Sequence, residues 1–74
     1  MTTETTQTPL RQRAVTIAID EVDDQTRAVA RMDWCDRKLV GVGRTRPAEL
    51  LTDRQAEKAS ITRALSDLIA QLNA

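Results

Sequence analysis

Apolar residues alternate with polar or small ones in three successive stretches of the chain. The first stretch, residues 14–20, places Ile17 and Ile19 on the same face, together with a third β-branched residue. The second stretch covers residues 26–34, and the third, residues 39–46, contains both glycines of the chain. A period of two with β-branched residues is typical of a half-buried strand. The pattern therefore predicts three β-strands.

A helical pattern follows the third stretch. Pro47 cannot donate to a sheet, so we expect the sheet to stop there. Thr52 followed by Gln55 is a capping-box pattern, and neither glycine nor proline interrupts the run from there to Asn73. Apolar side chains recur in this run at helical spacing: Ile61, Ala64, Leu65, Leu68 and Leu72. The run predicts one C-terminal helix with an apolar stripe.

The segments between the predicted strands are short and polar. Residues 20–24 are mostly acidic, and residues 33–38 are mostly charged, so both predict hairpin connections. Short connections favour an antiparallel arrangement. We therefore expect an α+β domain, a three-stranded antiparallel β-meander followed by one α-helix packed on one face (β-β-β-α).

The alternation also predicts which sheet face the helix covers. That face carries mainly apolar and small side chains: Val15, Ile17, Ile19, Ala28, Ala30, Met32, Trp34 and Leu39. Gly41 and Gly43 then lie on the helix side, which requires the helix to approach the third strand closely. Trp34 is expected to be a core anchor, and stacking on a nucleic-acid base is the alternative.

The size of the chain bears on its oligomeric state. Of its 74 residues, 1–12 are polar and lack a period, which predicts a disordered tail, and 13–74 form a single domain. A domain of about 60 residues has a marginal core, and a lone cysteine supplies no internal disulfide. We therefore expect a homodimer, formed through paired sheet edges or through a face bearing Val29, Val40 and Val42.

Charge and composition restrict the chemistry. Eleven basic residues balance eleven acidic ones, and histidine is absent, so the usual bases and many metal ligands are missing. We expect no enzymatic activity, catalytic residue, cofactor, metal site or small-molecule substrate. No run approaches the roughly 20 apolar residues that span a bilayer, and the start lacks the apolar core of a signal peptide. These features predict a cytoplasmic protein without membrane contact.

Three local patterns are interpreted as structural. The acidic residues 20–24 lack the glycine and the distal glutamate of a calcium loop, so a solvated turn is favoured. The pair Gly41 and Gly43 is not followed by the helix start that a phosphate loop needs. Cys35 has cationic neighbours but no base in the chain to support catalysis, which leaves a redox-sensitive or incidental thiol.

Arginines supply the one predicted binding surface. They occupy alternate positions on neighbouring predicted strands and therefore share one face: Arg27, Arg31, Arg44 and Arg46. The planar guanidinium suits contacts with phosphates. The alternative is a solvated face on which Asp33 and Asp20 pair locally with these arginines.

Several segments resemble a known family in their order and spacing: VTIAIDE (15–21), TRAVARMDW (26–34), KLVGVGRTRP (38–47) and ITRALSDL (61–68). They are similar to short actinobacterial proteins described mainly as a domain of unknown function, which include mycobacterial members induced in hypoxic dormancy. The resemblance implies a fold like that of double-stranded-RNA-binding domains and ribosome hibernation-promoting factors, and a dimer. Unlike full-type hibernation factors, this chain has no room for a helix between its first two strands.

The leading hypothesis follows from the arginine face together with this resemblance. It is a small, non-enzymatic stress or dormancy protein that associates with the ribosome or with structured RNA. The alternative is a protein interaction module that acts through a dimeric sheet surface and has no nucleic-acid role.

Overall fold

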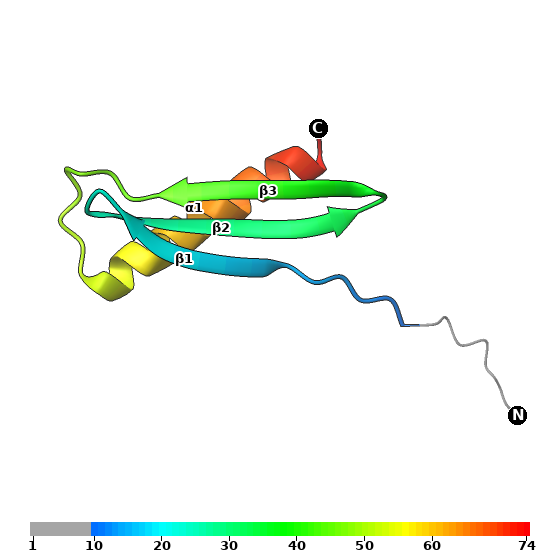
Figure 1. Cartoon of the computed structure of the whole chain (residues 1–74), viewed down its shortest axis with the longest axis horizontal. Coiled ribbons are helices and arrows are strands. Elements are labelled where there is room, and N and C mark those ends of the chain that lie inside the picture. The colour runs from blue at the N-terminus through cyan, green and yellow to red at the C-terminus, as the bar shows by residue number, and fades with distance from the viewer. Residues whose placement is uncertain (1–9) are drawn as a thin grey trace, which may run out of the picture.

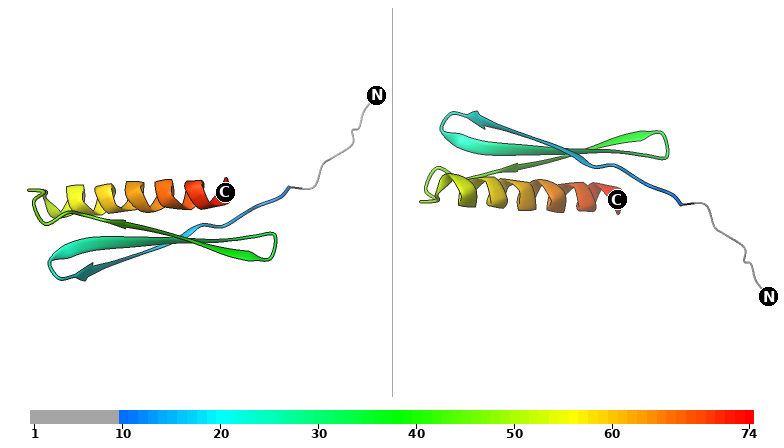
Figure 2. Two further views of the ribbon diagram at one scale, coloured as in Figure 1. Left: turned by 90° about the horizontal axis from the view of Figure 1, so that it is seen from above. Right: turned by 90° about the horizontal axis from the view of Figure 1, so that it is seen from below.

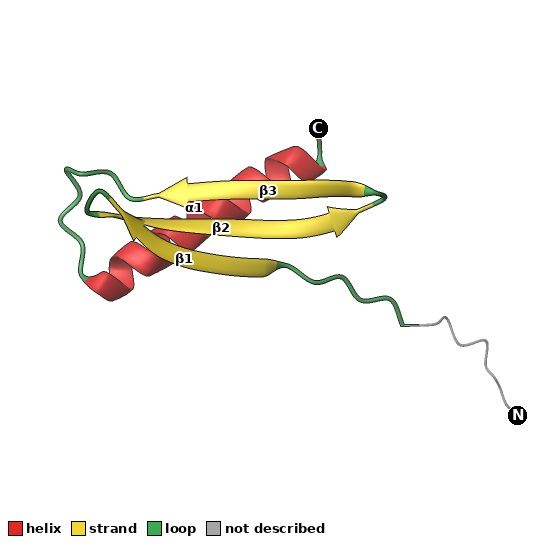
Figure 3. Ribbon diagram, viewed as in Figure 1, coloured by secondary structure: helices red, strands yellow, loops and turns green. Residues whose placement is uncertain are grey.

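The computed structural model of the chain describes residues 10–74. Most of the predicted tail, residues 1–9, lies outside the described residues. Three strands, β1 (Thr16–Val22), β2 (Gln25–Trp34) and β3 (Arg37–Arg44), form one antiparallel sheet in the order β1-β2-β3. The helix α1 (Asp53–Leu72) lies across one face (Figure 1, Figure 3). The predicted β-β-β-α architecture is confirmed.

Two-residue turns close both hairpins. Asp23 and Asp24 have φ of 52° and 61°, and Cys35 and Asp36 have φ of 49° and 64°. Positive φ at both central positions characterises the type I′ turn, whose twist matches that of the flanking strands. The connections are therefore shorter than the polar patterns predicted, and β1 continues to Val22 instead of ending at Asp20.

The two glycines of β3 allow α1 to approach the sheet closely, as predicted. A Cβ atom on Gly41 would lie 2.5 Å from the backbone nitrogen of Leu68, and a Cβ atom on Gly43 would collide with the carbonyl oxygen of Ser60. Ser60 is itself fully buried, and its hydroxyl donates to the carbonyl oxygen of Glu57. Any side chain at these two strand positions would thus push the helix away from the sheet.

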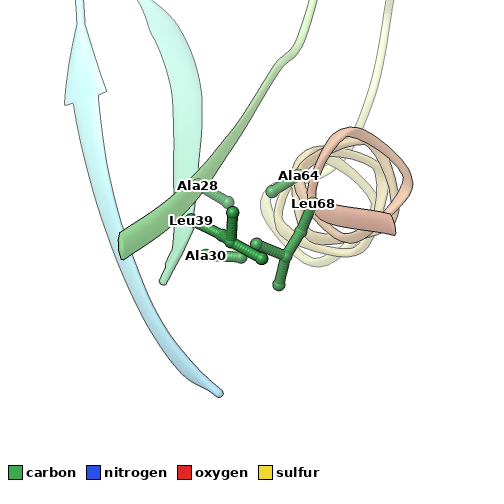
Figure 4. Packing of buried hydrophobic residues seen from close by; sticks show 5 residues of the cluster. All are labelled: Ala28, Ala30, Leu39, Ala64 and Leu68. Atoms are coloured by element: carbon green, nitrogen blue, oxygen red, sulfur yellow. The ribbon is translucent and has the colours of Figure 1, made fainter. Parts of the chain in front are cut away.

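The core lies between α1 and the pair β2 and β3. Five buried side chains form it, and three of them are alanines: Ala28, Ala30, Leu39, Ala64 and Leu68 (Figure 4). Met32, Ile61, Leu65 and Leu72 pack around this cluster and are partly buried. A core built from so few and such small side chains buries little apolar surface, which leaves the single chain marginally stable.

The helix does not cover β1, which corrects the predicted core. Ile17 and Ile19 lie in the middle of β1, yet their side chains remain 39% and 40% exposed. Neighbouring strands are about 4.8 Å apart and a helix is about 10 Å wide, so one helix covers about two strands. Because β2 and β3 carry alanines and glycines, α1 packs closely on these two strands. β1 lies beside the region that the helix covers (Figure 2).

Trp34 is not a core anchor, and that expectation was wrong. β1 begins opposite Arg31, so the hairpin of β2 and β3 projects beyond it (Figure 1). Trp34 lies in this projecting part and is 37% exposed. Alternation assigned Trp34 to the correct sheet face, but it could not show that the covering elements end before reaching it.

Candidate functional site

The sheet face opposite α1, which we call the open face, carries most of the predicted site. The strand register aligns its side chains in three cross-strand rows: Asp20, Arg27 and Arg44; Ala18, Val29 and Val42; Thr16, Arg31 and Val40. Three of the four predicted arginines thus share this face. Arg46 does not, because β3 ends at Arg44 and Arg46 lies in the following loop, where its backbone N–H donates to Oε1 of Glu49.

Arg27 is paired within the open face. Its Nε donates to Oδ1 of Asp20 at 2.9 Å, and its Nη2 donates to the second carboxylate oxygen. The hydrogen bonds from Arg27 lower the pKa of Asp20, and the Asp20 carboxylate raises the pKa of Arg27. Both side chains remain partly exposed. For Arg27, the structure therefore shows the predicted alternative, in which a nearby carboxylate pairs with the arginine.

The open face nevertheless has an excess of positive charge. Four cations (Arg27, Arg31, Lys38 and Arg44) share it with two strand carboxylates (Asp20 and Asp33), and Asp23 of the adjoining turn lines a hollow with Arg27 and Arg44, which leaves one positive charge in excess. Lys38 and Asp33 approach to only 4.0 Å and are both strongly exposed, so their pairing contributes little. Arg31 and Arg44 are exposed and extend from neighbouring strands. A polyanion lying across the sheet could contact both.

The three valines predicted as a dimer interface also lie together on the open face. Val29 pairs directly with Val42 in the register, and Val40 is two residues away on the same strand. Val29 is partly buried, whereas Val40 and Val42 are exposed. These valines separate the arginine rows, so the surface alternates between cationic and apolar bands.

The two edges of the sheet differ in what covers them. Along β3, side chains from α1 reach the strand backbone: Arg63 donates to the carbonyl oxygen of Arg44 at 2.8 Å, and Gln71 donates to that of Val40 at 2.5 Å. Between them, Asp67 accepts from the N–H of Val42. Among the hydrogen bonds of residues 10–74, none joins a side chain to the backbone of β1, where only the Asp20 side chain is bonded. The sheet therefore has one capped edge and one open edge.

Arg63 also holds the loop between β3 and α1. Its Nη1 and Nη2 donate to Oε1 and Oε2 of Glu49 at 2.8 and 2.9 Å. These bonds, together with the N–H of Arg46, lower the pKa of Glu49 from its ordinary 4.5 to about 2. Sequence reasoning missed this group and the edge contacts. The sequence does carry one signal for these contacts, because polar residues recur at every fourth position of the helix: Arg63, Asp67 and Gln71.

A second feature missed by sequence reasoning surrounds Trp34. The guanidinium carbon of Arg13 lies 5.2 Å from the centre of the indole ring. Beside the ring is an open hollow of about 370 Å³ with charged residues around it: Arg13, Asp33, Asp36, Arg37 and Lys38. Cys35 is exposed at the tip of the same hairpin. Arg13 precedes β1, where no periodic pattern marked it as part of a site.

The described part of the chain shows neither a cluster of metal ligands nor a helix that could span a membrane. Among residues 10–74, no three potential histidine, cysteine or carboxylate ligands cluster as a metal site would require. In the same range, no helix combines the length and apolar character needed to cross a bilayer.

Comparison with known proteins identifies uncharacterized relatives. No protein-family model matches the chain. The sequence is 44% identical over 60 residues to the uncharacterized protein Rv2632c of Mycobacterium tuberculosis (strain H37Rv), a match that covers 78% of this chain and 64% of that protein. It is also 44% identical over 61 residues to the uncharacterized protein Mb1767 of Mycobacterium bovis, covering 80% of this chain and 65% of the relative.

The fold is likewise similar to a solved structure. The crystal structure of Rv2632c matches with a TM-score of 0.74 and 37% sequence identity, covering 90% of this chain and 82% of that one. The chain spans about 64% of the full length of the first curated relatives. These matches confirm the expected actinobacterial family of unknown function.

Proposed function

The chain belongs to the family of uncharacterized mycobacterial proteins that includes Rv2632c, and from this premise we propose that it is a small, non-enzymatic RNA-contacting protein. Its RNA partner is structured RNA, above all that of the ribosome, and it acts under stress or in dormancy in the manner of hibernation-promoting factors. The observation that supports RNA contact is the excess of cations on the open face. The resemblance to hibernation-promoting factors suggests the ribosome.

The chemistry of the open face suits structured RNA. Double-stranded RNA is recognised largely by shape, through phosphates and 2′-hydroxyls, so the site needs no base-specific pocket. Arg31 and Arg44 offer planar guanidinium groups that can contact phosphates in pairs. The whole chain is neutral, and such a protein binds nucleic acid through a local surface instead of a general positive field.

We infer that the protein acts as a homodimer joined at the open edge of the sheet. The first half of β1, residues 16–19, carries β-branched side chains and none of the charged residues or prolines that commonly protect an edge strand, and Ile17 and Ile19 stay half-exposed beside the core. The two charged residues of β1, Asp20 and Glu21, lie nearer the turn. Antiparallel pairing of β1 with its copy would be self-complementary and would extend the sheet across both chains. Pairing through Val29, Val40 and Val42 would instead cover the arginines, so the edge is the better interface for an RNA-binding dimer.

Salt-dependent co-sedimentation with ribosomes tests the RNA proposal. We expect the wild type to sediment with ribosomes at low salt and to be released as salt rises. Arg31→Ala combined with Arg44→Ala should weaken association about tenfold, a loss of about 1.4 kcal/mol. The matched control is Arg54→Ala with Lys58→Ala, which removes the same charge from the exposed side of α1. Equal effects of the two double variants, or no association at all, would refute the proposal.

Sedimentation of the isolated protein tests the dimer. We expect the wild type to sediment at twice the chain mass and Ile19→Lys to sediment as a monomer, because the charge lies beside the paired edge. Val22→Lys places the same charge on the opposite face of β1 and should remain dimeric. A monomeric wild type would contradict the dimer, and a dimeric Ile19→Lys would place the interface elsewhere.

A protein interaction module is the second candidate, favoured by the apolar band on the open face. Val40 and Val42 are both exposed there, and Val29 adjoins them. Under this alternative, Val40→Asp abolishes association with a protein partner, and salt has little influence. Retention of ribosome binding by Val40→Asp, with loss in the arginine variant, would decide in favour of RNA.

A further inference from the structure

We propose that the tip of the hairpin formed by β2 and β3 is a base-stacking site, in which Trp34 stacks against an unpaired RNA base. Arg13, Arg37 and Lys38 then contact the adjoining phosphates. This inference rests on the proposed RNA function and specifies a second class of RNA contact, with single-stranded nucleotides instead of duplex. The stacking site adjoins the open face, because Lys38 and Asp33 belong to both surfaces.

The position of Trp34 is the first observation. It is the single aromatic residue of the chain, and 37% of it is exposed. It pairs with Arg37 next to the turn, on the part of the hairpin that extends past the start of β1 and past the end of α1 (Figure 1). A large aromatic ring that served only the core would be expected beneath the helix, where alanines and leucines lie instead.

The contact with Arg13 is the second observation. Its guanidinium lies 5.2 Å from the ring centre, so a planar cation already occupies one face of the indole. Trp34 remains 37% exposed beside this cation, which leaves indole surface for a second flat group. Nucleic-acid bases are such groups, and each presents a π-face whatever its sequence.

The surroundings of the ring supply the third observation. The adjoining hollow has a volume of about 370 Å³ and is open to solvent beside the ring. Three cations, Arg13, Arg37 and Lys38, surround it with two carboxylates, Asp33 and Asp36. An aromatic platform beside a net positive charge is the combination that single-stranded nucleic-acid sites use.

Tryptophan fluorescence tests the site directly, because the chain has no second tryptophan. We expect single-stranded oligoadenylate to quench and shift the emission of Trp34. An abasic phosphodiester oligomer of the same length carries the same charge but no bases, and it should leave the emission unchanged. Equal quenching by both oligomers would show phosphate contact without stacking and would overturn the inference.

Affinity measurements on variants provide the second readout. Trp34→Leu should bind labelled oligoadenylate about tenfold more weakly, and Trp34→Phe should recover part of the loss. Circular dichroism and the urea midpoint establish whether each variant is folded; the position of Trp34 outside the core predicts that both are. Unchanged affinity of a folded Trp34→Leu would refute base stacking.

The outcomes separate this inference from the proposed function. Loss of ribosome association in the Arg31 and Arg44 variant, with no response of Trp34 to oligoadenylate, would refute the stacking site and leave the function standing. Base-dependent quenching without any ribosome association would refute the proposed ribosome association and leave the stacking site standing.

Discussion

The backbone N–H of Val42 donates to Oδ2 of Asp67 at 2.9 Å, which joins the edge strand β3 to the C-terminal half of α1. In an antiparallel sheet, an edge strand points alternate N–H and C=O groups away from its partner. Asp67 satisfies one such donor, while Arg63 and Gln71 satisfy acceptors on either side. The helix thus closes the β3 edge against further strands, and β1 remains the edge available for pairing.

Asp67→Ala should lower the free energy of unfolding by about 1 kcal/mol, because the Val42 N–H loses a hydrogen bond to a charged acceptor at a partly hydrated site. Urea denaturation measures the change. Asp67→Asn, which keeps an oxygen acceptor, should lose less. Equal midpoints for wild type and Asp67→Ala would show that the contact contributes nothing to stability.

Gly43→Ala should destabilise the protein by about 1–3 kcal/mol, because the added methyl group meets the backbone of α1 at Ser60 and Ala64. Thermal or urea unfolding measures the loss. Val42→Ala is the matched control on the other face of the same strand, where the helix does not pack, and it should cost about 1 kcal/mol or less. A Gly43→Ala variant as stable as the wild type would mean that the helix moves away at no cost.

Asp23→Asn combined with Asp24→Gly should stabilise the protein by about 1 kcal/mol. Both positions have positive φ, and Asn-Gly is the preferred pair in type I′ turns. Ala at both positions is the contrasting variant and should destabilise, because the short polar side chain of Asp can hydrogen-bond locally in the left-handed region, whereas Ala has the Cβ but no such bond. The urea midpoints should therefore rise for Asn-Gly and fall for Ala-Ala; the opposite order would rule out the type I′ geometry.

The ion pair between Glu49 and Arg63 should make stability depend on pH. The pKa of Glu49 is lowered from 4.5 to about 2, so the folded state prefers the charged carboxylate. Its stabilising effect is complete above the unfolded pKa and is lost as pH falls from about 4.5 towards about 2.

Unfolding of Glu49→Gln across this pH range provides the measurement. The wild type should be more stable than the variant near neutral pH, and the difference should shrink progressively below about pH 4.5. Asp53→Asn is the control, because that carboxylate has no described contact with Arg63. A difference independent of pH would show that Glu49 stabilises the loop without its charge.

Sequence reasoning recovered much of the fold because the relevant signals are local. Alternation identified the three strands and placed Gly41 and Gly43 under the helix, and the capping box at Thr52 and Gln55 is present as predicted. Strand ends were less accurate, since Asp20 and Glu21 look like turn residues but belong to an exposed edge strand. Their polarity is compatible with both environments.

The candidate site was only partly predictable. Alternation assigned Arg27, Arg31 and Arg44 to one face, as the register confirms. Local pairing with Asp20 was an alternative that the sequence offered, but alternation could not show that Arg27 is the arginine that forms this pair, or that Arg13 reaches Trp34. These contacts depend on where side chains from separate segments meet in space, and no local pattern encodes that.

By itself, the sequence determined the order of the elements and the two faces of the sheet, because a period of two or 3.6 residues fixes which side chains point together. Only the tertiary structure decided which strands the helix covers. One helix is too narrow for three strands, and the small residues of β2 and β3 admit it there. As a result, β1 keeps an open edge with Ile17 and Ile19 exposed, and Trp34 lies beyond the core.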